Sequence, residues 1–191
     1  MISLMTSLMT SLADRPNTAL LVIDLQNGVV ANIYRRDEVL QTVAKLVEQA
    51  RDANVPVVWV RDDELVVGSE DWQIAPELSP DPDEPIIDKA YRDAFEATRL
   101  EEVLATSGVG KVIVVGAETD MCIRSTLHGA LARGYDVTLV SDAHTTGDRS
   151  HKGAPLPAAV ISHTNMYWSN QKAPGRSGNI IDSNAIVFGE S

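Results

Sequence analysis

The stretch that begins at residue 19 reads Ala19-Leu20-Leu21-Val22-Ile23-Asp24, a continuous apolar run that ends in a carboxylate. A short, uninterrupted run of this kind is typical of a strand buried on both faces of a parallel sheet. Three more runs follow it along the chain: Val55-Pro56-Val57-Val58-Trp59-Val60, Lys111-Val112-Ile113-Val114-Val115-Gly116 and Asp136-Val137-Thr138-Leu139-Val140. Four such runs predict a sheet.

The segments between these runs have helical periodicity. Two helical faces are predicted, the first formed by Val39, Val43, Leu46, Val47 and Ala50 and the second by Phe95, Leu100, Val103 and Leu104. A third helix is predicted from about Cys122 to Arg133, with Gly134 in the position where glycine commonly ends a helix. Right-handed crossovers then place helices on both faces, which gives a three-layer α/β/α domain with a mostly parallel, Rossmann-like sheet and a ligand site at the carboxyl ends of the strands.

Two regions interrupt this alternation. Residues 62–85 are rich in Asp, Glu and Pro, and we expect an exposed excursion over the sheet edge that forms part of a lid. Residues 173–183 carry Pro174, Gly175 and Gly178, and a last strand is predicted after them at residues 185–188. Neither region is long enough to separate domains, so we expect a single domain over residues 18–191 that follows a loose leader over residues 1–17.

The size and charge of the chain exclude several classes of protein. The chain has 191 residues, of which 44% are hydrophobic and 23% are charged, as in soluble globular proteins of one domain. Its formal net charge is −11, and no dense basic cluster occurs along it. Binding to a phosphate backbone or to an anionic membrane surface requires the opposite sign, so we expect neither nucleic acid nor a membrane as a partner.

The cysteine content and the first residues of the chain indicate the cellular compartment in which the protein is expected. Cys122 is the one cysteine of the chain, so no intramolecular disulfide can form and a reducing, cytoplasmic compartment is expected. The Met-rich start, residues 1–12, lacks the basic region and the apolar run of a signal peptide. No stretch approaches the roughly 20 apolar residues that cross a bilayer.

Three reactive side chains are predicted at the carboxyl edge of the sheet: Asp24 after the first strand, Lys89 after a short extended segment, and Cys122 in the turn after Val115. In the first turn of a helix, Cys122 would have a lowered thiol pKa and N–H groups nearby that could hold an oxyanion. Asp24 could take the thiol proton and return it to a leaving amine, while Lys89 holds both anions. The plainer interpretations are an apolar filler for Cys122, a turn cap for Asp24 and a solvated charge for Lys89, and spacing alone leaves both interpretations open.

Three motifs that occur in order carry a resemblance: Leu21-Val22-Ile23-Asp24-Leu25-Gln26-Asn27, Lys89 with Ala94-Phe95-Glu96-Ala97-Thr98-Arg99-Leu100, and Gly116-Ala117-Glu118-Thr119-Asp120-Met121-Cys122. The chain resembles the isochorismatase-like cysteine hydrolases, from about Thr18 to Ala143 and more weakly to Phe188. The resemblance implies that Asp24 is the catalytic base, Lys89 its electrostatic partner and Cys122 the nucleophile. It also implies a cis peptide at Ala117–Glu118 and an oxyanion hole formed by the N–H groups of Glu118 and Cys122.

The chain departs from the family patterns in the region that binds a metal in nicotinamidases. Where those relatives carry Asp-x-His, this chain has Arg61-Asp62-Asp63-Glu64. The histidines, His128, His144, His151 and His163, lie far along the chain without zinc-site spacing. We therefore expect no metal and no cofactor, and we interpret the acidic residues as a solvated loop. The role of His163 stays open.

The substrate is less well defined than the chemistry. Several true isochorismatases lack the cysteine and hydrolyse a vinyl ether with the Asp as general acid, whereas Cys122 favours covalent chemistry. The leading hypothesis is a metal-independent hydrolase of the C–N bond in a small amide, ureide, imide or lactam. The alternatives are a vinyl-ether hydrolase and a catalytically silent binding protein of the same fold. Aromatic candidates for a pocket wall are Tyr34, Trp59, Trp72, Tyr91, Tyr167 and Trp168. The resemblance also implies a homo-oligomer, a dimer or larger.

Overall fold

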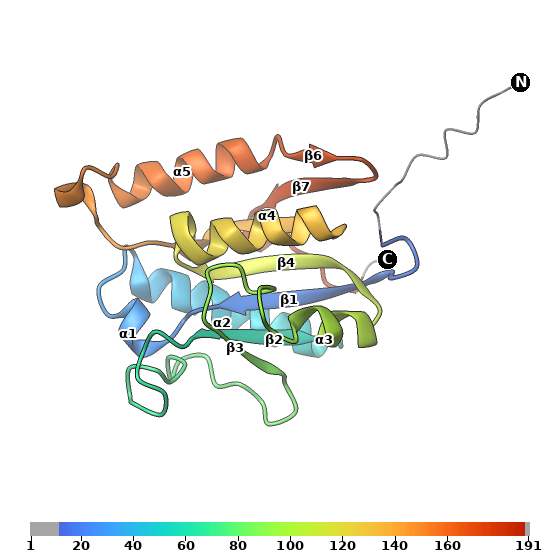
Figure 1. The fold of residues 1–191 in the computed structure, drawn as a ribbon, viewed down its shortest axis with the longest axis horizontal. Coiled ribbons are helices and arrows are strands. Elements are labelled where there is room, and N and C mark those ends of the chain that lie inside the picture. Colours follow the sequence, from blue (N-terminus) through green and yellow to red (C-terminus); the bar gives the residue numbers. More distant parts are fainter. Residues whose placement is uncertain (1–11, 190–191) are drawn as a thin grey trace, which may run out of the picture.

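The strands form one sheet in a computed structural model that describes residues 12–189 (Figure 1). Seven strands of the described chain lie in the order β3-β2-β1-β4-β5-β7-β6. Their bounds are β1 (Asn17–Ile23), β2 (Val57–Asp62), β3 (Ile86–Lys89), β4 (Val109–Ala117), β5 (Asp136–Thr145), β6 (Lys172–Ala173) and β7 (Arg176–Ile181). All neighbouring strands pair in parallel except β6 and β7. The prediction of a mostly parallel α/β sheet is confirmed.

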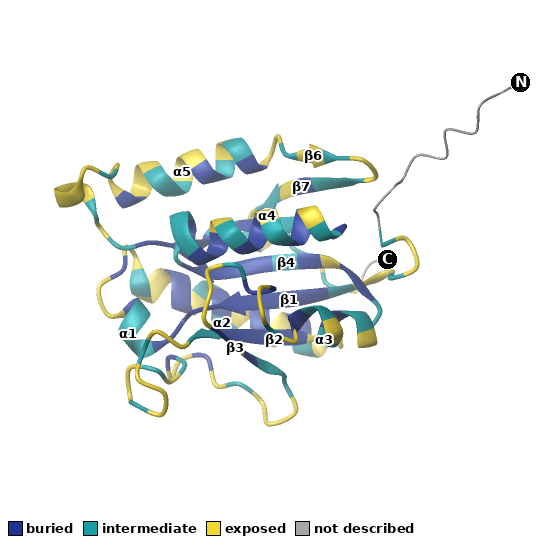
Figure 2. Ribbon diagram, viewed as in Figure 1, coloured by how far each residue is buried: buried dark blue, intermediate teal, exposed yellow. Residues whose placement is uncertain are grey.

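Helices cover both faces of this sheet, as expected. They are α1 (Asn27–Val30), α2 (Arg36–Asp52), α3 (Leu100–Thr106), α4 (Arg124–Arg133) and α5 (Pro157–Trp168), with a π-helical turn η1 (Thr119–Ile123) and the short 3₁₀ turns η2 (Ser150–Lys152) and η3 (Ser183–Ala185). One buried core lies between the sheet and α3, α4 and α5, and a second lies between the sheet and α2. Figure 2 shows the strands between them as the most buried layer. The molecule therefore has three layers.

The helices that the periodicity predicts form largely as expected. The buried face of α2 includes Val39, Val43, Leu46, Val47 and Ala50. Helix α4 ends at Arg133, and Gly134 has a φ of 109°, a left-handed conformation that glycine adopts at little cost. The third predicted helix begins two residues later than expected, because residues 119–123 form η1. Phe95 is buried but precedes α3.

The prediction for the end of the chain is wrong. Residues 185–188 form no strand, whereas β7 lies within the segment that was expected to be irregular. Gly178 explains why the pattern misleads, because a Cβ atom there would lie 2.9 Å from Trp168, which α5 packs against the strand. A glycine that usually weakens a strand is here the residue that lets a helix approach it.

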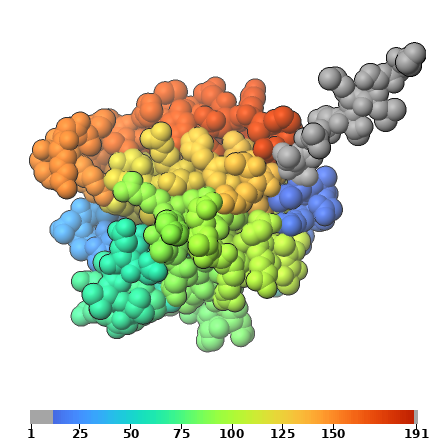
Figure 3. Space-filling view, viewed as in Figure 1, coloured from blue at the N-terminus to red at the C-terminus, as the bar shows by residue number. Residues whose placement is uncertain are grey.

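The connection from β2 to β3 contains no helix. Residues 63–85 form an irregular loop that is largely exposed and lies on the opposite side of the molecule from α5 (Figure 3). Backbone bonds tie it to α1, just after β1, from Asn27 N to Gln73 O (2.9 Å) and from Gly28 N to Asp71 O (2.9 Å). The predicted exposed excursion is therefore present, and it lies against the carboxyl end of β1.

The predicted leader falls mostly on residues 1–11, which lie outside the described residues. Residues 12–16 precede β1, and Arg15 pairs with Glu101 at 2.8 Å. Between residues 12 and 189, no helix combines the length and the apolar character that a membrane span requires.

Candidate active site

The ends of four adjacent strands converge on one point of the carboxyl edge. Asp24 follows β1, Asp62 ends β2, Lys89 ends β3, and Cys122 lies in η1 just after β4. Strand order reverses between β1 and β4. The chain passes from β1 through α2 to β2 on one side of β1, whereas β4 lies next to β1 on its other side. Such a reversal opens a crevice at the strand ends. The three residues singled out in the sequence, Asp24, Lys89 and Cys122, are thus brought together.

The Lys89 ammonium is the centre of this cluster. Its Nζ lies 2.8 Å from Asp24 Oδ2, 3.1 Å from Asp62 Oδ2 and 3.3 Å from Cys122 Sγ. An ammonium group has three N–H donors, so each donor has one acceptor. Burial alone lowers the pKa of Lys89, but the interactions with its three partners, Asp24 first among them, outweigh this effect and raise the pKa above its ordinary value. Lys89 is therefore a buried, permanently charged cation.

Asp24 is a buried carboxylate with an unused oxygen. Burial raises the pKa of Asp24 to about 6, Lys89 opposes this rise, and the negative charge of Asp62 adds to it. Oδ2 accepts from Lys89, whereas Oδ1 is buried and accepts no hydrogen bond from any described residue. A buried carboxylate oxygen without a donor is costly, unless a reacting group supplies the donor. Asp24 is thus placed to accept a proton near neutral pH.

The expectation of a lowered pKa at Cys122 is wrong. Burial raises the pKa of the thiol well above its ordinary value, the Asp24 charge raises it further, and Lys89 offsets only part of the increase. The side chain is 6% exposed and lies in the π-helical turn rather than in the first turn of α4. Desolvation of a thiolate at this position outweighs the attraction of the Lys89 ammonium. The resting side chain is a neutral thiol.

The turn before Cys122 is fixed by its own backbone and by a neighbouring loop. Gly116 has a φ of 122°, and a Cβ there would lie 2.1 Å from the carbonyl oxygen of Ile23, so the close contact with β1 requires glycine. The peptide bond between Ala117 and Glu118 is cis, at the position that the resemblance implies. The Glu118 carboxylate accepts from Gly147 N (3.1 Å) and pairs with Arg149.

Asp62 is a site residue that the sequence did not single out. It was expected to belong to a solvated loop, but its carboxylate contacts Lys89 and lies 3.9 Å from Cys122 Sγ. The buried Gln26 holds its backbone on both sides, accepting from Asp62 N (2.7 Å) and donating to Asp62 O (3.0 Å). Asp62 pairs with Lys89 in the β2–β3 register, so a correct prediction of β3 would have placed the two side by side.

Two cavities meet at Cys122. The larger, of about 470 Å³, is lined by Asp62, Glu64, Ala90, Tyr91, Arg92, Glu118, Met121, Cys122 and Arg149. The smaller, of about 260 Å³, is lined by Asp24, Gly28, Val29, Asp62, Glu64, Leu65, Glu118 and Cys122. Their shared wall contains the thiol and three carboxylates. A small molecule of polar character can therefore reach Cys122 and Asp24 together.

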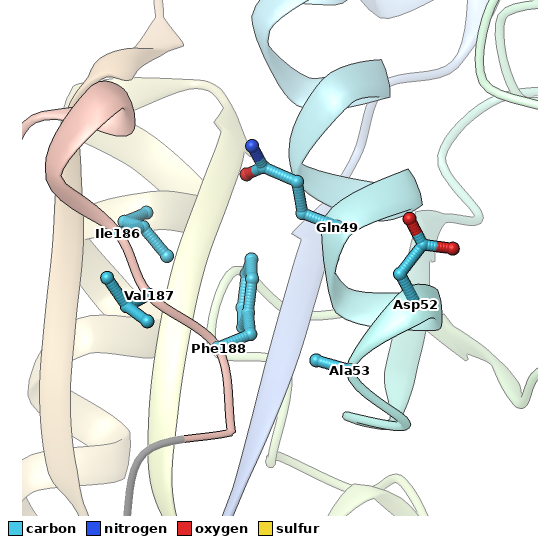
Figure 4. Close-up of a pocket in the computed structure, with 6 residues that line it drawn as sticks. All are labelled: Gln49, Asp52, Ala53, Ile186, Val187 and Phe188. Carbon is cyan, nitrogen blue, oxygen red and sulfur yellow. The ribbon is translucent and has the colours of Figure 1, made fainter.

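A further cavity lies away from this chemistry. It has a volume of about 360 Å³ and separates the end of α2 from residues 186–188 (Figure 4). Gln49 and Asp52 are its polar side chains, and no nucleophile lines it. Among the described residues, Cys122 and Asp24 line the cavities at the carboxyl edge.

A lysine occupies the place where a metal ion could otherwise be held. Asp24, Asp62 and Cys122 present ligand atoms within 4.8 Å of one another. The Lys89 ammonium lies within 3.3 Å of one atom from each of them, so this cation already neutralises the group. The Asp-x-His pattern that would favour a metal is missing from Asp62-Asp63-Glu64. The residues present fit an ammonium better than a metal ion.

The remaining candidates lie outside the cavities that meet at Cys122, apart from Tyr91, which lines the larger one. His163 is exposed on α5 and packs on Tyr167, with 5.5 Å between ring centroids. Trp59 and Trp168 belong to the buried core. Arg61 Cζ lies over the ring of Trp72, 3.5 Å from the ring centroid. His163 therefore has a surface position.

Comparison with known proteins agrees with this geometry. A family model described as the isochorismatase domain matches residues 18–159. The chain is 34% identical to a streptothricin hydrolase of Streptomyces noursei over 73% of this chain and 58% of that protein, so it spans less than two thirds of this relative's length. It is 32% identical to nicotinamidase 3 of Arabidopsis thaliana, over 67% of this chain and 73% of that protein.

Solved structures share the same fold. An isochorismatase of Pseudomonas putida KT2440 superposes with a TM-score of 0.77 at 27% identity, covering 93% of this chain and 92% of the other. A cysteine hydrolase of Pseudomonas syringae pv. phaseolicola 1448A superposes with a TM-score of 0.79 at 24% identity, covering 88% and 89%. The second likeness concerns the fold alone.

Proposed function

The chain belongs to the isochorismatase family of hydrolases, and from this premise we propose that it cleaves the carbon–nitrogen bond of a small amide, ureide, imide or lactam through a covalent intermediate on Cys122. One observation carries the proposal: the thiol of Cys122 lies against a buried ammonium that also binds the Asp24 carboxylate. A nucleophile, a base and a fixed cation in mutual contact are the parts that acyl transfer requires.

Acylation begins with a neutral thiol. As Cys122 Sγ forms its bond to the substrate carbonyl carbon, the thiol proton passes to Asp24, whose Oδ1 has no other donor among the described residues. The raised pKa of Asp24, about 6, suits a group that must accept a proton and then release it. Lys89 keeps its charge throughout, so the site never holds an isolated anion.

The carbonyl oxygen becomes an oxyanion in this step, and we assign its stabilisation to the backbone N–H groups of Glu118 and Cys122. The contacts of Glu118 with Arg149 and Gly147 support this assignment, because they fix the turn that carries both groups. Asp24 then protonates the leaving nitrogen as the C–N bond breaks, which leaves a thioester on Cys122.

Water completes the reaction by attack on the thioester carbonyl. Asp24 takes one proton from the water, the C–S bond breaks, and the same proton restores the thiol. The products are a carboxylic acid and an amine or ammonia, so atoms and charges balance without a cofactor. The streptothricin hydrolase and nicotinamidase among the relatives support amide hydrolysis as the reaction class.

The test is amine or ammonia release from a panel of amides, ureides, imides and lactams in the presence of a chelator, with isochorismate as a further substrate. We expect turnover in the wild type, and a loss of at least about a thousandfold in Cys122→Ala and Cys122→Ser. Mass spectrometry of the intact wild type and of Cys122→Ala will show whether an acyl adduct depends on Cys122, the one cysteine of the chain. Full activity of Cys122→Ala, or turnover of isochorismate alone that survives in this variant, would contradict the covalent mechanism.

A further inference from the structure

Asp62 is held through its backbone and through both of its carboxylate oxygens. Gln26 holds both backbone polar groups of Asp62, and Asp62 Oδ1 accepts from Glu64 N at 2.9 Å. These contacts leave Oδ2 directed at Lys89, 3.1 Å from Nζ. The side chain is 20% exposed, in contrast to 2% for Asp24, so the cluster has one inner and one outer carboxylate around a shared ammonium.

We propose that Asp62 is a positioning residue of this site: it holds the Lys89 ammonium against Cys122, and its negative charge keeps one mobile proton within the cluster. The inference rests on the proposed function in one respect, namely that Cys122 is the nucleophile. Nothing in the proposed chemistry uses Asp62 as a base or as an acid.

The charges of the cluster explain this role. Two carboxylates and one ammonium leave one excess negative charge beside the thiol, so ionisation of Cys122 would place a second anion 3.9 Å from Asp62 Oδ2. Like charges at this separation disfavour each other, most of all where water is largely excluded. The same repulsion raises the pKa of Asp24, which makes Asp24 able to return the proton to a leaving amine.

Other charged groups face the cluster from the elements around it. Glu64 and Arg92 come from the loops after β2 and β3, and Glu118 and Arg149 form an ion pair on the side of η1. Glu64 and Arg92 are both exposed, so solvent screens them more strongly than Asp62. Asp62, unlike these four groups, forms an ion pair with Lys89.

A purely structural role for Asp62 makes a different prediction. If Asp62 served only to fix the loop after β2, its loss would reduce stability and activity without changing the ionisation of Cys122 or Asp24. Under our proposal, Asp62→Asn keeps the size and an acceptor for Lys89 but removes the charge. Cys122 and Asp24 should then ionise more readily. The reaction itself should become slower, because Lys89 is less well positioned and Asp24 returns a proton less easily.

The experiment compares Asp62→Asn and Asp62→Ser, which remove the charge, with Asp62→Glu, which keeps it. Asp63→Asn is the matched control, since it makes the same charge change at the neighbouring, exposed residue. Iodoacetamide alkylation at neutral pH measures the thiolate of the single cysteine without any substrate. The pH profile of kcat/KM measures the ionisation of Asp24, and thermal unfolding verifies that each variant is folded.

We expect alkylation of Cys122 to be about tenfold faster in Asp62→Asn and Asp62→Ser than in the wild type. In both variants the acid limb of the kcat/KM profile should move down by about one pH unit, and kcat should be about tenfold lower. Asp63→Asn should resemble the wild type in all three measurements, and Asp62→Glu, which keeps the charge, should keep the wild-type alkylation rate. Equal alkylation rates in Asp62→Asn and Asp63→Asn would overturn the proposal, as would failure of both charge-removing variants to fold. If Cys122→Ala retained turnover, the proposed function would fail, while the alkylation rates would still decide the role of Asp62.

Discussion

At the scale of single residues, the site is organised around the buried ammonium group of Lys89. The side chain of Lys89 is fully buried, and its three donors are all engaged by Asp24, Asp62 and Cys122. Removing the ammonium from this buried cluster would leave two carboxylates without a compensating charge. Asp24 can exchange its proton, while the charge of Lys89 stays constant.

The ionisation of Asp24 predicts the acid side of the activity profile. Asp24 must be a carboxylate to accept the thiol proton, and burial raises its pKa to about 6. The group therefore binds a proton as the pH falls below about 6, and kcat/KM should decrease by about tenfold for each further pH unit. Initial rates between pH 4.5 and 8 on the best amide substrate measure this limb. An activity that stays constant down to pH 5 would contradict the role of Asp24 as the base.

The sequence predicted part of this site. The positions of Asp24, Lys89 and Cys122 followed from strand ends and from the resemblance. Asp62 was missed because its local sequence, Arg61-Asp62-Asp63-Glu64, is that of a solvated loop. The pKa of Cys122 was predicted in the wrong direction, because the burial of the thiol is a tertiary property that no local pattern contains.

At the scale of elements, a buried histidine joins β5 to the π-helical turn η1 and to α5. His144 bonds to Thr119 Oγ1 and to Asn165 Oδ1, each at 2.9 Å. Thr119 belongs to η1, the element that carries Cys122. The position of Cys122, the proposed nucleophile, therefore depends on the packing of α5, which comes from a distant part of the chain.

The same histidine predicts a pH dependence of stability. Burial lowers the pKa of His144 to about 4, so the unfolded state binds a proton more readily than the folded state. The stabilisation is complete above about pH 6.5 and decreases by about 3 kcal/mol as the pH falls to about 4. Urea unfolding at pH 7 and pH 4.5 should show a change in the free energy of unfolding that is less favourable in the wild type than in His144→Asn by most of this amount, because the opposite effect of the raised Asp24 pKa is common to both proteins. His163→Asn, an exposed histidine on α5, should keep the wild-type dependence. Equal pH dependence in His144→Asn and the wild type would exclude this explanation.

The elements that escaped prediction share a physical cause. Helix α5 is apolar or small on several sides, so it lacks the one-sided periodicity that made α2 visible. Strand β7 contains Gly178, which local propensity disfavours and the contact with Trp168 requires. In both cases the contact between two segments decides the structure.

At the scale of the whole molecule, four neighbouring strands must be in register before the site exists. The order β3-β2-β1-β4 places Lys89, Asp62, Asp24 and the Cys122 turn side by side. These residues come from distant parts of the chain, which makes the site dependent on long-range strand pairing. The alternation of buried runs and helices predicted this arrangement, because parallel strands with crossover helices all end at the same edge.

The enclosure of Lys89 also makes this lysine a reporter of an intact sheet. Amine acylation requires a free, uncharged amine, whereas Lys89 is buried and holds its proton more tightly than an ordinary lysine. Every other lysine, namely Lys45, Lys111, Lys152 and Lys172, is exposed. An acetylating reagent should therefore modify those four in the folded protein and add the fifth lysine only after denaturation, as peptide mapping would record. Acetylation of Lys89 in the native protein at the rate of the others would mean that the sheet edge opens readily. If Lys89 stays unmodified, the unacetylated peptide that contains it can serve as a marker of folded protein during purification.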